Sequence, residues 1–284
     1  MREHGDGGGR VIMAKSISVI IVSYHTGPSL IDGLNALIAD IDASEIILVD
    51  NGNPKEMREH IASINSPKLR ILQGHGNIGF GAGCNYGAQI CGGDFIAFIN
   101  PDASPSQGAL AAMKDVIKSA PTPSIAGGLL LDETGVEQRG SRRGEITLLK
   151  YFGALIGIDK FNLHKTPLPA APHEVGTVSG AAMMMTRASF DALGGFDERY
   201  FLHVEDIDIC KRARKMGGHI ISVPEAKIVH IGATSQTSSL FVSAHKTSGF
   251  VRYFWTHSGV FGKIGTVMAA PIIMVATMLH GLLR

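Results

Sequence analysis

The stretch Asp94-Phe-Ile-Ala-Phe-Ile-Asn-Pro-Asp102 does most to decide the fold class of this chain. Its apolar run, residues 95–99, lacks the polar alternation of a half-exposed strand and is typical of a strand buried on both faces. Asn100-Pro101-Asp102 follows directly, so Asp102 is expected just past the carboxyl end of that strand. In an open α/β sheet ligands bind at this edge, where a carboxylate can hold a divalent cation against a diphosphate. The same residues also suit an ordinary turn.

Upstream of this stretch, apolar β-branched runs alternate with segments of helical periodicity. The runs are residues 17–23, 45–50 and 69–72. Leu30, Leu34 and Leu37 recur at helical spacing between the first two runs, and residues 54–64 are predicted to be helical between the next two. This alternation predicts an α/β fold with a mixed, mostly parallel sheet flanked by helices.

Downstream, the pattern is less regular. Residues 74–93 are unusually rich in glycine, with a loop predicted around residues 77–87, and residues 132–174 are expected to form a mobile excursion over the cleft. The remaining elements are predicted to be helices at 106–118 and 204–216 and strands at 125–131, 175–186, 219–223 and 226–231.

The C-terminal residues 264–283 contain no Asp, Glu, Lys or Arg. Their length just suffices to cross a bilayer. Pro271 and His280 nevertheless favour a hydrophobic hairpin or an in-plane helix at a membrane surface. The alternative is a helix packed on the domain or on a second copy of the chain. The sequence is thus divided into a disordered tail (1–14), a main domain (15–237) and a membrane-associating or oligomerising helical segment (238–284).

The composition bounds the function. Of 284 residues 45% are apolar and 18% are charged, and the net charge is +1, so no basic field indicates nucleic-acid binding. The first ten residues lack an apolar core behind a basic start, which argues against a secretory signal. The three cysteines lack metal-ligand spacing and are expected to be reduced thiols. We therefore expect a cytoplasmic protein, peripheral on the inner face of the cell membrane.

Glu205 and Asp206 open the predicted helix 204–216. Acidic residues in a first turn often only complement the helix dipole. Here they follow the apolar sequence Phe201-Leu202-His203-Val204. Desolvation in such a setting raises the pKa of a carboxylate and makes it a better base, so the pair is a candidate for general base catalysis.

Three other features are weaker candidates. His230 ends an apolar run, and a lone histidine on a strand is more often a core residue than a ligand unless it converges on Asp102. Asp50, at the end of the second predicted strand, is a candidate to accept hydrogen bonds from a nucleotide base or ribose, or it simply forms an Asp-Asn-Gly turn. The glycine-rich loop around residues 77–87 allows close approach of a diphosphate. A basic cluster either clamps phosphate or, as we slightly favour, lies in solvent; it comprises Arg139, Arg142 and Arg143.

Six segments in chain order together resemble family 2 glycosyltransferases with the GT-A fold, over about residues 17–235. They are SVIIVSYHTGPSL, EIILVDNGN, GNIGFGAGCNYGA, FIAFINPD, VSGAAMMMTRASFDALGGFDERYFLHVEDIDICKRARKMG and AKIVHIGATS. The rhamnosyltransferase-like branch is the most similar, because of its Asn-Pro-Asp motif, its VEDID helix and its basic-aromatic tail.

The resemblance implies roles for individual residues. Asp102 corresponds to the metal-binding carboxylate of the Asp-x-Asp motif, whose first acid is here Asn100. Asp206 corresponds to the catalytic base, with Glu205 beside it. His230 corresponds to a histidine that completes the metal site in some relatives.

The resemblance also implies a nucleotide-binding side. Asp50 corresponds to the residue that contacts the base, and Ser23 and Tyr24 lie in the neighbouring strand-end loop. Asn77 and Asn85 fall in the nucleotide-side loop.

These implications define an inverting, metal-dependent glycosyltransferase that uses Mg²⁺ or Mn²⁺. The expected donor is dTDP-rhamnose, with UDP-sugars next, and the expected acceptor is a lipid-linked or polysaccharide hydroxyl. One alternative is a sugar-nucleotide pyrophosphorylase, although Tyr24-His-Thr-Gly27 lacks the longer glycine-rich loop with Arg and Lys that such an enzyme needs. Another is a catalytically silent nucleotide-sugar-binding scaffold, which Asn100 leaves open.

Overall fold

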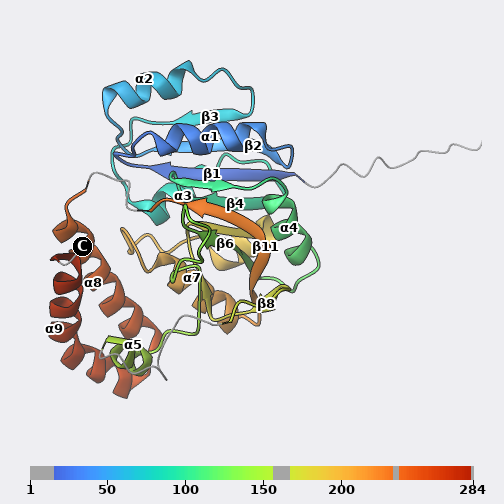
Figure 1. Cartoon of the computed structure of the whole chain (residues 1–284). Coiled ribbons are helices and arrows are strands. Elements are labelled where there is room, and N and C mark those ends of the chain that lie inside the picture. The colour runs from blue at the N-terminus through green and yellow to red at the C-terminus, as the bar shows by residue number, and fades with distance from the viewer. Residues whose placement is uncertain (1–15, 156–166, 233–236, 283–284) are drawn as a thin grey trace, which may run out of the picture.

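The computed structural model describes residues 16–155, 167–232 and 237–282. In these ranges nine strands form one sheet in the order β3-β2-β1-β4-β10-β6-β11-β5, with β8 paired to β11. The predicted mixed α/β sheet flanked by helices is confirmed (Figure 1). The predicted disordered tail, residues 1–14, lies outside the described part of the chain.

The amino-terminal half of the sheet is parallel. Strand β1 (Ile17–Ser23) pairs with β2 (Ala43–Asp50) and β4 (Phe95–Ile99), and β2 pairs with β3 (Leu69–Leu72). Helices α1 (Ser29–Ala39) and α2 (Lys55–Ser63) connect them. Every residue of β1 and β4 is buried, as their uninterrupted apolar sequences predict.

The second half adds antiparallel strands. Its first elements are β5 (Ala103–Pro105), α4 (Ala109–Ile117) and β6 (Ile125–Leu131). They are followed by β10 (Ala182–Thr186), α6 (Arg187–Leu193), α7 (Glu205–Lys215) and β11 (Ile220–His230). Strand β10 lies antiparallel between β4 and β6. The two strands predicted at 219–223 and 226–231 are one strand, β11, because the ladder to β6 only shifts register between Val223 and Lys227.

The glycine-rich segment contains a helix, α3 (Phe80–Ala88), where the sequence predicted a loop. Glycine lowers helix propensity, but here it lets the helix approach the sheet. A Cβ atom added to Gly83 would lie 2.8 Å from Val22, and one added to Gly87 would lie 2.8 Å from Ile20. Close packing against β1 therefore overrides the local preference.

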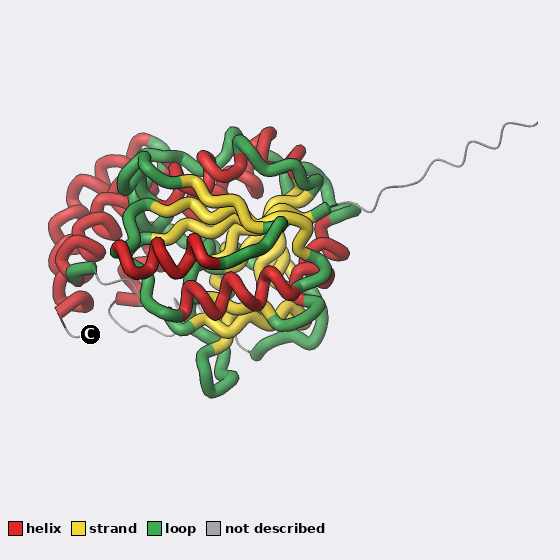
Figure 2. Tube along the Cα trace, turned by 90° about the horizontal axis from the view of Figure 1, so that it is seen from above, coloured by secondary structure: helices red, strands yellow, loops and turns green. Residues whose placement is uncertain are grey.

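Helices cover both faces of the sheet (Figure 2). Ile17, Val19 and Ile21 of β1 pack in a core with α1 and α4. Ile20 and Val22 of the same strand pack on the opposite side with α3, α6 and α7. This alternation follows from the two-residue period of a strand.

The segment predicted as a mobile excursion contains ordered structure in its described part. Strand β7 (Arg142–Arg143) pairs with β9 (Thr177–Val178), helix α5 covers Leu148–Leu155, and β8 (His173–Glu174) joins the edge of β11. Residues 156–166, which fall in the same predicted excursion, lie outside the described ranges.

The chain ends in two long helices, α8 (Ser239–His257) and α9 (Val260–Leu282). They pack side by side at one end of the domain (Figure 1). A third core, which includes Phe250, Tyr253 and Ile273, joins them to Tyr151 of α5 and Ile207 of α7. The predicted C-terminal hydrophobic helical appendage is therefore confirmed.

Candidate active site

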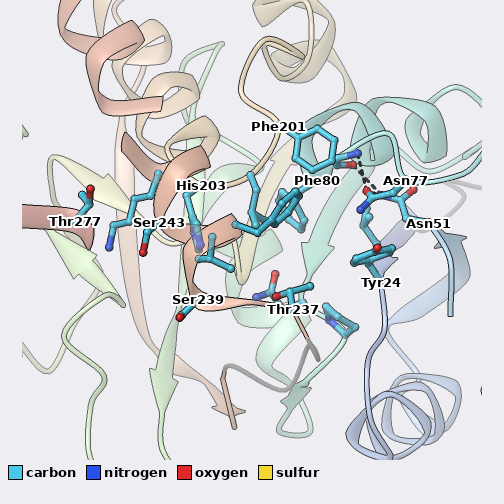
Figure 3. A pocket seen from close by; sticks show the side chains of 18 of the residues that line it. Tyr24, Asn51, Asn77, Phe80, Phe201, His203, Thr237, Ser239, Ser243 and Thr277 are labelled. Carbon is cyan, nitrogen blue, oxygen red and sulfur yellow. Dashed lines mark hydrogen bonds between the residues drawn. The ribbon is translucent and has the colours of Figure 1, made fainter. Parts of the chain in front are cut away.

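A cavity of about 690 Å³ lies between the carboxyl ends of the strands and the C-terminal helices. Figure 3 shows Tyr24, Asn51 and Asn77 at one end and Ser243 and Thr277 at the other. We call the end at Tyr24, Asn51 and Asn77 the strand end, and the end at Ser243 and Thr277, on the antiparallel helices α8 and α9, the hairpin end. The cavity lies at the carboxyl edge of the sheet, which is where an open α/β fold binds ligands.

The strand end carries two linked asparagines. Asn51 Nδ2 donates to the Gly79 carbonyl at 3.0 Å and to Asn77 Oδ1 at 3.4 Å, and the Gly79 amide donates to Asn77 Oδ1 at 3.1 Å. Both side chains line the cavity. Sequence reasoning singled out Asn77 but missed Asn51, although its position directly after β2 was the signal that could have found it.

Asp50 and Ser23 support this end from behind. Asp50 is buried, and its Oδ1 accepts hydrogen bonds from the amides of Gly52 at 2.9 Å and Asn53 at 2.8 Å. Ser23 Oγ accepts from Asn53 Nδ2 at 2.6 Å. Neither is among the residues that line the cavity, whereas Tyr24 is. The contacts of Asp50 are those of the turn that the sequence left as an alternative.

Asn85 lies away from the cavity. Its Oδ1 accepts from the Phe196 amide at 2.8 Å, and its Nδ2 donates to the Phe196 carbonyl and to Glu198, both at 2.9 Å. Asn85 therefore holds the loop after α6 against α3. It does not line the nucleotide side of the cavity, where the resemblance had placed it. The spacing in the glycine-rich segment suggested a loop, whereas a helix turns this side chain away.

Asp102 and His230 converge although 128 residues separate them in the chain. His230 Nε2 lies 3.2 Å from Asp102 Oδ1 and 3.3 Å from Asn100 Nδ2. The cause is the sheet: β5, which follows the Asn-Pro-Asp motif, pairs with β11, and His230 is opposite Ala103. All three side chains line the cavity. This convergence is the condition on which the sequence made His230 a ligand candidate.

Gln138 fixes the orientation of the His230 ring. Its Nε2 donates to the His230 carbonyl at 2.5 Å, so its Oε1 faces His230 Nδ1 at 2.8 Å. Because an amide oxygen can only accept, Nδ1 carries the proton and Nε2 presents a lone pair toward Asp102. This is the arrangement in which a histidine coordinates a metal and a second residue orients it. Sequence reasoning did not single out Gln138.

These residues fit a divalent cation only as part of a shared site. Among the described residues, no group of three or more His, Cys, Asp or Glu side chains is placed to hold a metal. Asp102 and His230 supply two ligands, and hard cations prefer six or more oxygens. A bound diphosphate would have to supply further ligands, so the donor set matches a cation that arrives with its nucleotide.

Glu205 and Asp206 follow a strained stretch of backbone. His203 has φ 66° and Val204 has φ 74°, a conformation that is rare for a β-branched residue. Such strain persists where surrounding contacts impose it and is common at functional sites. Here Val204 is buried against α8 at Gly249, and it directly precedes the first residue of α7.

The two carboxylates have different environments. Burial, reinforced by the charge of Asp206, raises the pKa of Glu205 well above its usual range, and its Oε2 has no hydrogen-bond partner in the described part of the chain. Asp206 Oδ2 instead accepts from Arg143 Nη2 at 2.9 Å and from the Gly180 amide at 3.2 Å. The predicted desolvation therefore acts on Glu205, while Asp206 pairs with Arg143. Neither residue directly lines the cavity.

The basic cluster is only partly in solvent, which corrects the slightly favoured interpretation. Arg142 is 1% exposed and forms two hydrogen bonds with Glu137. Arg143 pairs with Asp206. Both residues lie in β7, which pairs with β9, whereas Arg139 lies outside this strand and is exposed.

His203 lies between the two ends of the cavity (Figure 3). Burial lowers the pKa of His203 to about 4, and the positive charge of Lys246 lowers it further. The imidazole is therefore neutral at pH 7. The charge of Asp206 acts in the opposite direction, so His203 is electrostatically coupled both to the candidate base and to Lys246 of α8.

Asp208 ties helix α7 to helix α8. Its carboxylate accepts from His257 Nε2 and Arg212 Nε, both at 2.7 Å, and from Tyr200 at 3.3 Å. Lys215 Nζ lies 3.1 Å from the other ring nitrogen of His257. Because ammonium can only donate, His257 Nδ1 accepts and its Nε2 carries the proton.

This fold and this site define a glycosyltransferase of the GT-A type. The chain matches the model of glycosyl transferase family 2 over residues 18–194 and belongs to that family. It is 27% identical over 267 residues, 87% of each chain, to N-acetylglucosaminyl-diphospho-decaprenol L-rhamnosyltransferase of Mycobacterium tuberculosis. It is 25% identical over 225 residues to rhamnosyltransferase WbbL of Escherichia coli, covering 75% of this chain and 83% of that one.

A solved structure has the same fold. Mannosyltransferase PcManGT from Pyrobaculum calidifontis, in complex with GDP-Man and Mn²⁺, superposes with a TM-score of 0.59 at 15% identity. The match covers 93% of this chain and 73% of that one. The family and fold agree with the resemblance inferred from the sequence, and they give the pyrophosphorylase alternative no support.

Proposed function

We propose that this enzyme transfers rhamnose from dTDP-rhamnose, with inversion, to a hydroxyl of a lipid-linked or polysaccharide acceptor. The observation that carries the proposal is the convergence of Asp102 and His230 at 3.2 Å in a cavity that Asn51 and Asn77 also line. The names of the two rhamnosyltransferase relatives support the choice of sugar and of a lipid-linked acceptor. A UDP-sugar is the second candidate donor.

The strand end is the proposed donor site. Tyr24 offers a ring and the Asn51–Asn77 pair offers amide groups to a pyrimidine base or ribose, with Asp50 and Ser23 holding the loop behind them. Asn100, Asp102 and His230 face the diphosphate. A bound Mg²⁺ or Mn²⁺ would supply positive charge that stabilises the departing nucleoside diphosphate.

Asp206 is the proposed base. Its Oδ2 forms an ion pair with Arg143 at 2.9 Å, and its charge acts on His203, which lines the cavity. The acceptor hydroxyl gives its proton to Asp206 as its oxygen bonds to the anomeric carbon. The bond from that carbon to the diphosphate breaks, and the nucleoside diphosphate leaves with the electron pair. A single displacement of this kind inverts the anomeric centre.

We also propose that α9 attaches the enzyme peripherally to the cytoplasmic face of a membrane. Residues Val260–Met278 are long and apolar enough to cross a bilayer, and only 22% of this stretch is buried inside the protein. Length and composition do not distinguish a span from an in-plane helix. The packing of α9 along α8 supports the in-plane arrangement.

A thermal-shift screen tests the donor proposal. dTDP, UDP, GDP and ADP are each added with and without Mg²⁺ or Mn²⁺, and the melting temperature of the full chain is measured. We expect dTDP, and more weakly UDP, to stabilise the protein, and the stabilisation to require the metal. A folded protein that none of the nucleotides stabilises would favour the silent scaffold instead.

A further inference from the structure

The last part of the chain differs in charge from the rest. No Asp or Glu follows Glu225, whereas five Lys or Arg residues do. The net charge of +1 therefore divides into +5 after Glu225 and −4 before it. An asymmetry of this kind indicates that one part of a protein contacts an anionic partner, such as a membrane surface. Nothing in the proposed transfer reaction requires it.

Two of these cations lie at the elbow of the helical hairpin, which we define as residues 252–264. The elbow contains the end of α8, the connection through Ser258 and Gly259, and the first turn of α9. Figure 1 shows the C terminus at one end of the hairpin, so the elbow is at the other end. Arg252 is exposed near the end of α8, and Lys263 is the only Lys or Arg in the sequence of α9. The elbow is therefore a positively charged corner of the molecule.

The chain's single tryptophan lies beside both cations. Arg252 precedes Trp255 by three residues, so the two side chains are neighbours on one face of α8. Lys263 Nζ lies over the indole ring, 5.3 Å from its centroid, in a cation–π contact. Trp255 is 48% exposed. An exposed indole flanked by cations is typical of side chains that lie at the level of lipid headgroups, because one end of the ring is apolar and the other is polar.

A small apolar crevice lies beside the tryptophan. Its volume is about 300 Å³. It is lined by Trp255, Val260, Lys263, Ile264 and Val267. Val260, Ile264 and Val267 are also exposed apolar residues of α9, and the neighbouring Phe261 is 89% exposed. The cations of the elbow are thus continuous with an apolar surface, as binding to an amphiphile requires.

An anionic lipid surface fits the elbow better than a second copy of the chain does. A two-fold interface brings the same patch of both copies together. Arg252 and Lys263 would then face their own equivalents, and neither α8 nor α9 contains an Asp or Glu to compensate. The acidic residue that contacts the end of α8, Asp208, is 1% exposed and bonded to His257 and Arg212. Anionic headgroups supply the negative charge that the protein lacks here.

We propose that the elbow binds the phosphate headgroups of anionic phospholipids and thereby fixes how the enzyme lies on the membrane. Arg252 and Lys263 pair with phosphate oxygens, Trp255 lies at the level of the headgroups, and Phe261 enters the acyl chains. This inference rests on the proposed attachment through α9 and adds the class of lipid. With the elbow anchored, the negatively charged remainder of the protein lies away from the anionic surface.

Trp255 itself reports on this binding, because it is the only tryptophan in the chain. The full chain is titrated with vesicles of phosphatidylcholine alone, and with vesicles that contain equal amounts of phosphatidylcholine and phosphatidylglycerol. We expect the emission of Trp255 to shift to shorter wavelength. Binding to the mixed vesicles should be at least about tenfold tighter, since each cation near an anionic surface contributes about fivefold in affinity.

The failure of the headgroup site and the failure of the membrane attachment differ in this titration. Equal affinity for the two kinds of vesicle would overturn the headgroup site and leave the apolar attachment. No binding to either kind would overturn both. An emission shift that grows with protein concentration in the absence of lipid would show that a second copy covers the elbow, which would also overturn the proposal.

Lys263→Gln and Lys227→Gln form a matched pair, because Lys227 is an exposed lysine of β11 that also follows Glu225 but lies outside the elbow. Affinities are measured by cosedimentation, since Lys263 contacts the fluorescent ring. We expect Lys263→Gln to weaken binding to the mixed vesicles about fivefold, Lys227→Gln to leave it unchanged, and Lys263→Arg to retain it. Equal effects of the two Gln variants would show that only total charge matters and would contradict a site at the elbow.

The depth of Trp255 provides a separate test. Phospholipids brominated near the headgroup should quench its emission more than phospholipids brominated at the ends of the acyl chains. The opposite order would place the ring inside the hydrocarbon and overturn the proposal. Metal-dependent stabilisation by dTDP should be the same in wild type and in the Lys263 variants. Its absence from the wild type would count against the proposed donor site and would leave the elbow assignment standing.

Discussion

At the scale of single residues, the site depends on side chains that hold other side chains in place. Gln138 orients His230, Arg143 holds Asp206, and Asn53 links Asp50 to Ser23. Gln138 and Arg143 hydrogen-bond to a proposed metal ligand and to the proposed base, Asn53 joins two residues of the loop behind the donor site, and none of the three lines the cavity. Substituting one of these supporting residues should therefore change the position or protonation of the side chain that it holds, while that side chain itself stays in the protein.

Asp206→Asn should lower the rate of sugar transfer by about a hundredfold or more, because a general base contributes about 10²–10⁴ in rate. Metal-dependent dTDP stabilisation should persist. The matched variant is Glu205→Gln: since burial favours the protonated form of Glu205, a neutral amide should retain most of the activity. Rates are measured from release of dTDP. Unchanged turnover in Asp206→Asn would show that the base is another group.

Gln138→Leu should raise the Mn²⁺ concentration needed for half-maximal dTDP stabilisation by about tenfold, as losses of residues that orient metal ligands do. Without the amide oxygen, the proton of His230 can move to Nε2 and block the lone pair that faces Asp102. Arg139→Gln changes the exposed neighbouring side chain and serves as control. The same Mn²⁺ dependence in both variants would exclude this role for Gln138.

At the scale of elements, the proposed catalytic helix α7 is positioned by α8. The contacts are a buried hydrogen bond from His257 Nε2 to Asp208 and the close approach of Gly249 to Val204. Asp208 thereby connects α7 to His257, a residue of α8 that is 49 positions further along the chain. The C-terminal segment is thus part of the site's framework.

Asp208→Asn should destabilise the fold by about 2–3 kcal/mol at neutral pH, because a buried charged group loses its hydrogen bonds. Burial acts to raise the pKa of Asp208, but contacts with His257 and Arg212 outweigh it and lower the pKa below 3.8. A carboxyl group whose pKa is lower in the folded than in the unfolded protein contributes its full stabilisation when the pH is above the unfolded-state pKa. This stabilisation is lost as the pH falls through the folded-state pKa.

The difference in melting temperature between wild type and Asp208→Asn should therefore be constant from about pH 5 to 8 and shrink below about pH 4. Tyr200, Arg212, His257 and Lys215 are the neighbouring polar groups. Asp115→Asn is a control, since that carboxylate is 61% exposed in a surface ion pair. A difference that grows on acidification would contradict the pairing.

At the scale of the whole molecule, α9 is apolar all round but buried along one stripe. Thr266, Ala269, Ile273 and Thr277 face the protein. The exposed side carries large apolar side chains, which are Val260, Phe261, Ile264, Val267, Met268, Ile272, Met274, Val275 and Met278. A patch of this kind on a protein surface indicates a membrane or protein contact.

Replacing Phe261, Val267 and Met268 together by Ser should weaken binding to anionic phospholipid vesicles at least about tenfold, since each partly inserted side chain contributes about 1 kcal/mol. Ile41 and Val136 are exposed apolar residues elsewhere, and their replacement by Ser is the control. Binding is measured by cosedimentation. If the triple variant binds vesicles normally but changes from dimer to monomer in light scattering, the face joins two copies of the chain.

Local sequence determined several strands of the sheet. Residues 17–23, 69–72 and 125–131 were predicted with the bounds that β1, β3 and β6 have. The first and third runs are apolar and lie in central strands, so the pattern and the tertiary environment agree there, whereas β3 contains Arg70 and forms the edge of the sheet. Helix α3 was missed because glycine opposes helix formation locally, and only the close approach to β1 explains it.

Strand-end positions also determined which polar residues to consider, because a sheet collects the ends of its parallel strands at one edge. Sequence alone thus placed Asp102 and Tyr24 near a ligand and selected the family. Tertiary structure decided which of the candidates meet. In the structure His230 lies next to Asp102, and Asn51 and Gln138 belong to the site although the sequence analysis did not single them out. Asn85 lies outside the cavity, and Lys246 lines it together with His203. These outcomes depend on contacts between residues far apart in the chain, whose energies come from packing and burial and leave no periodic signal in the local sequence.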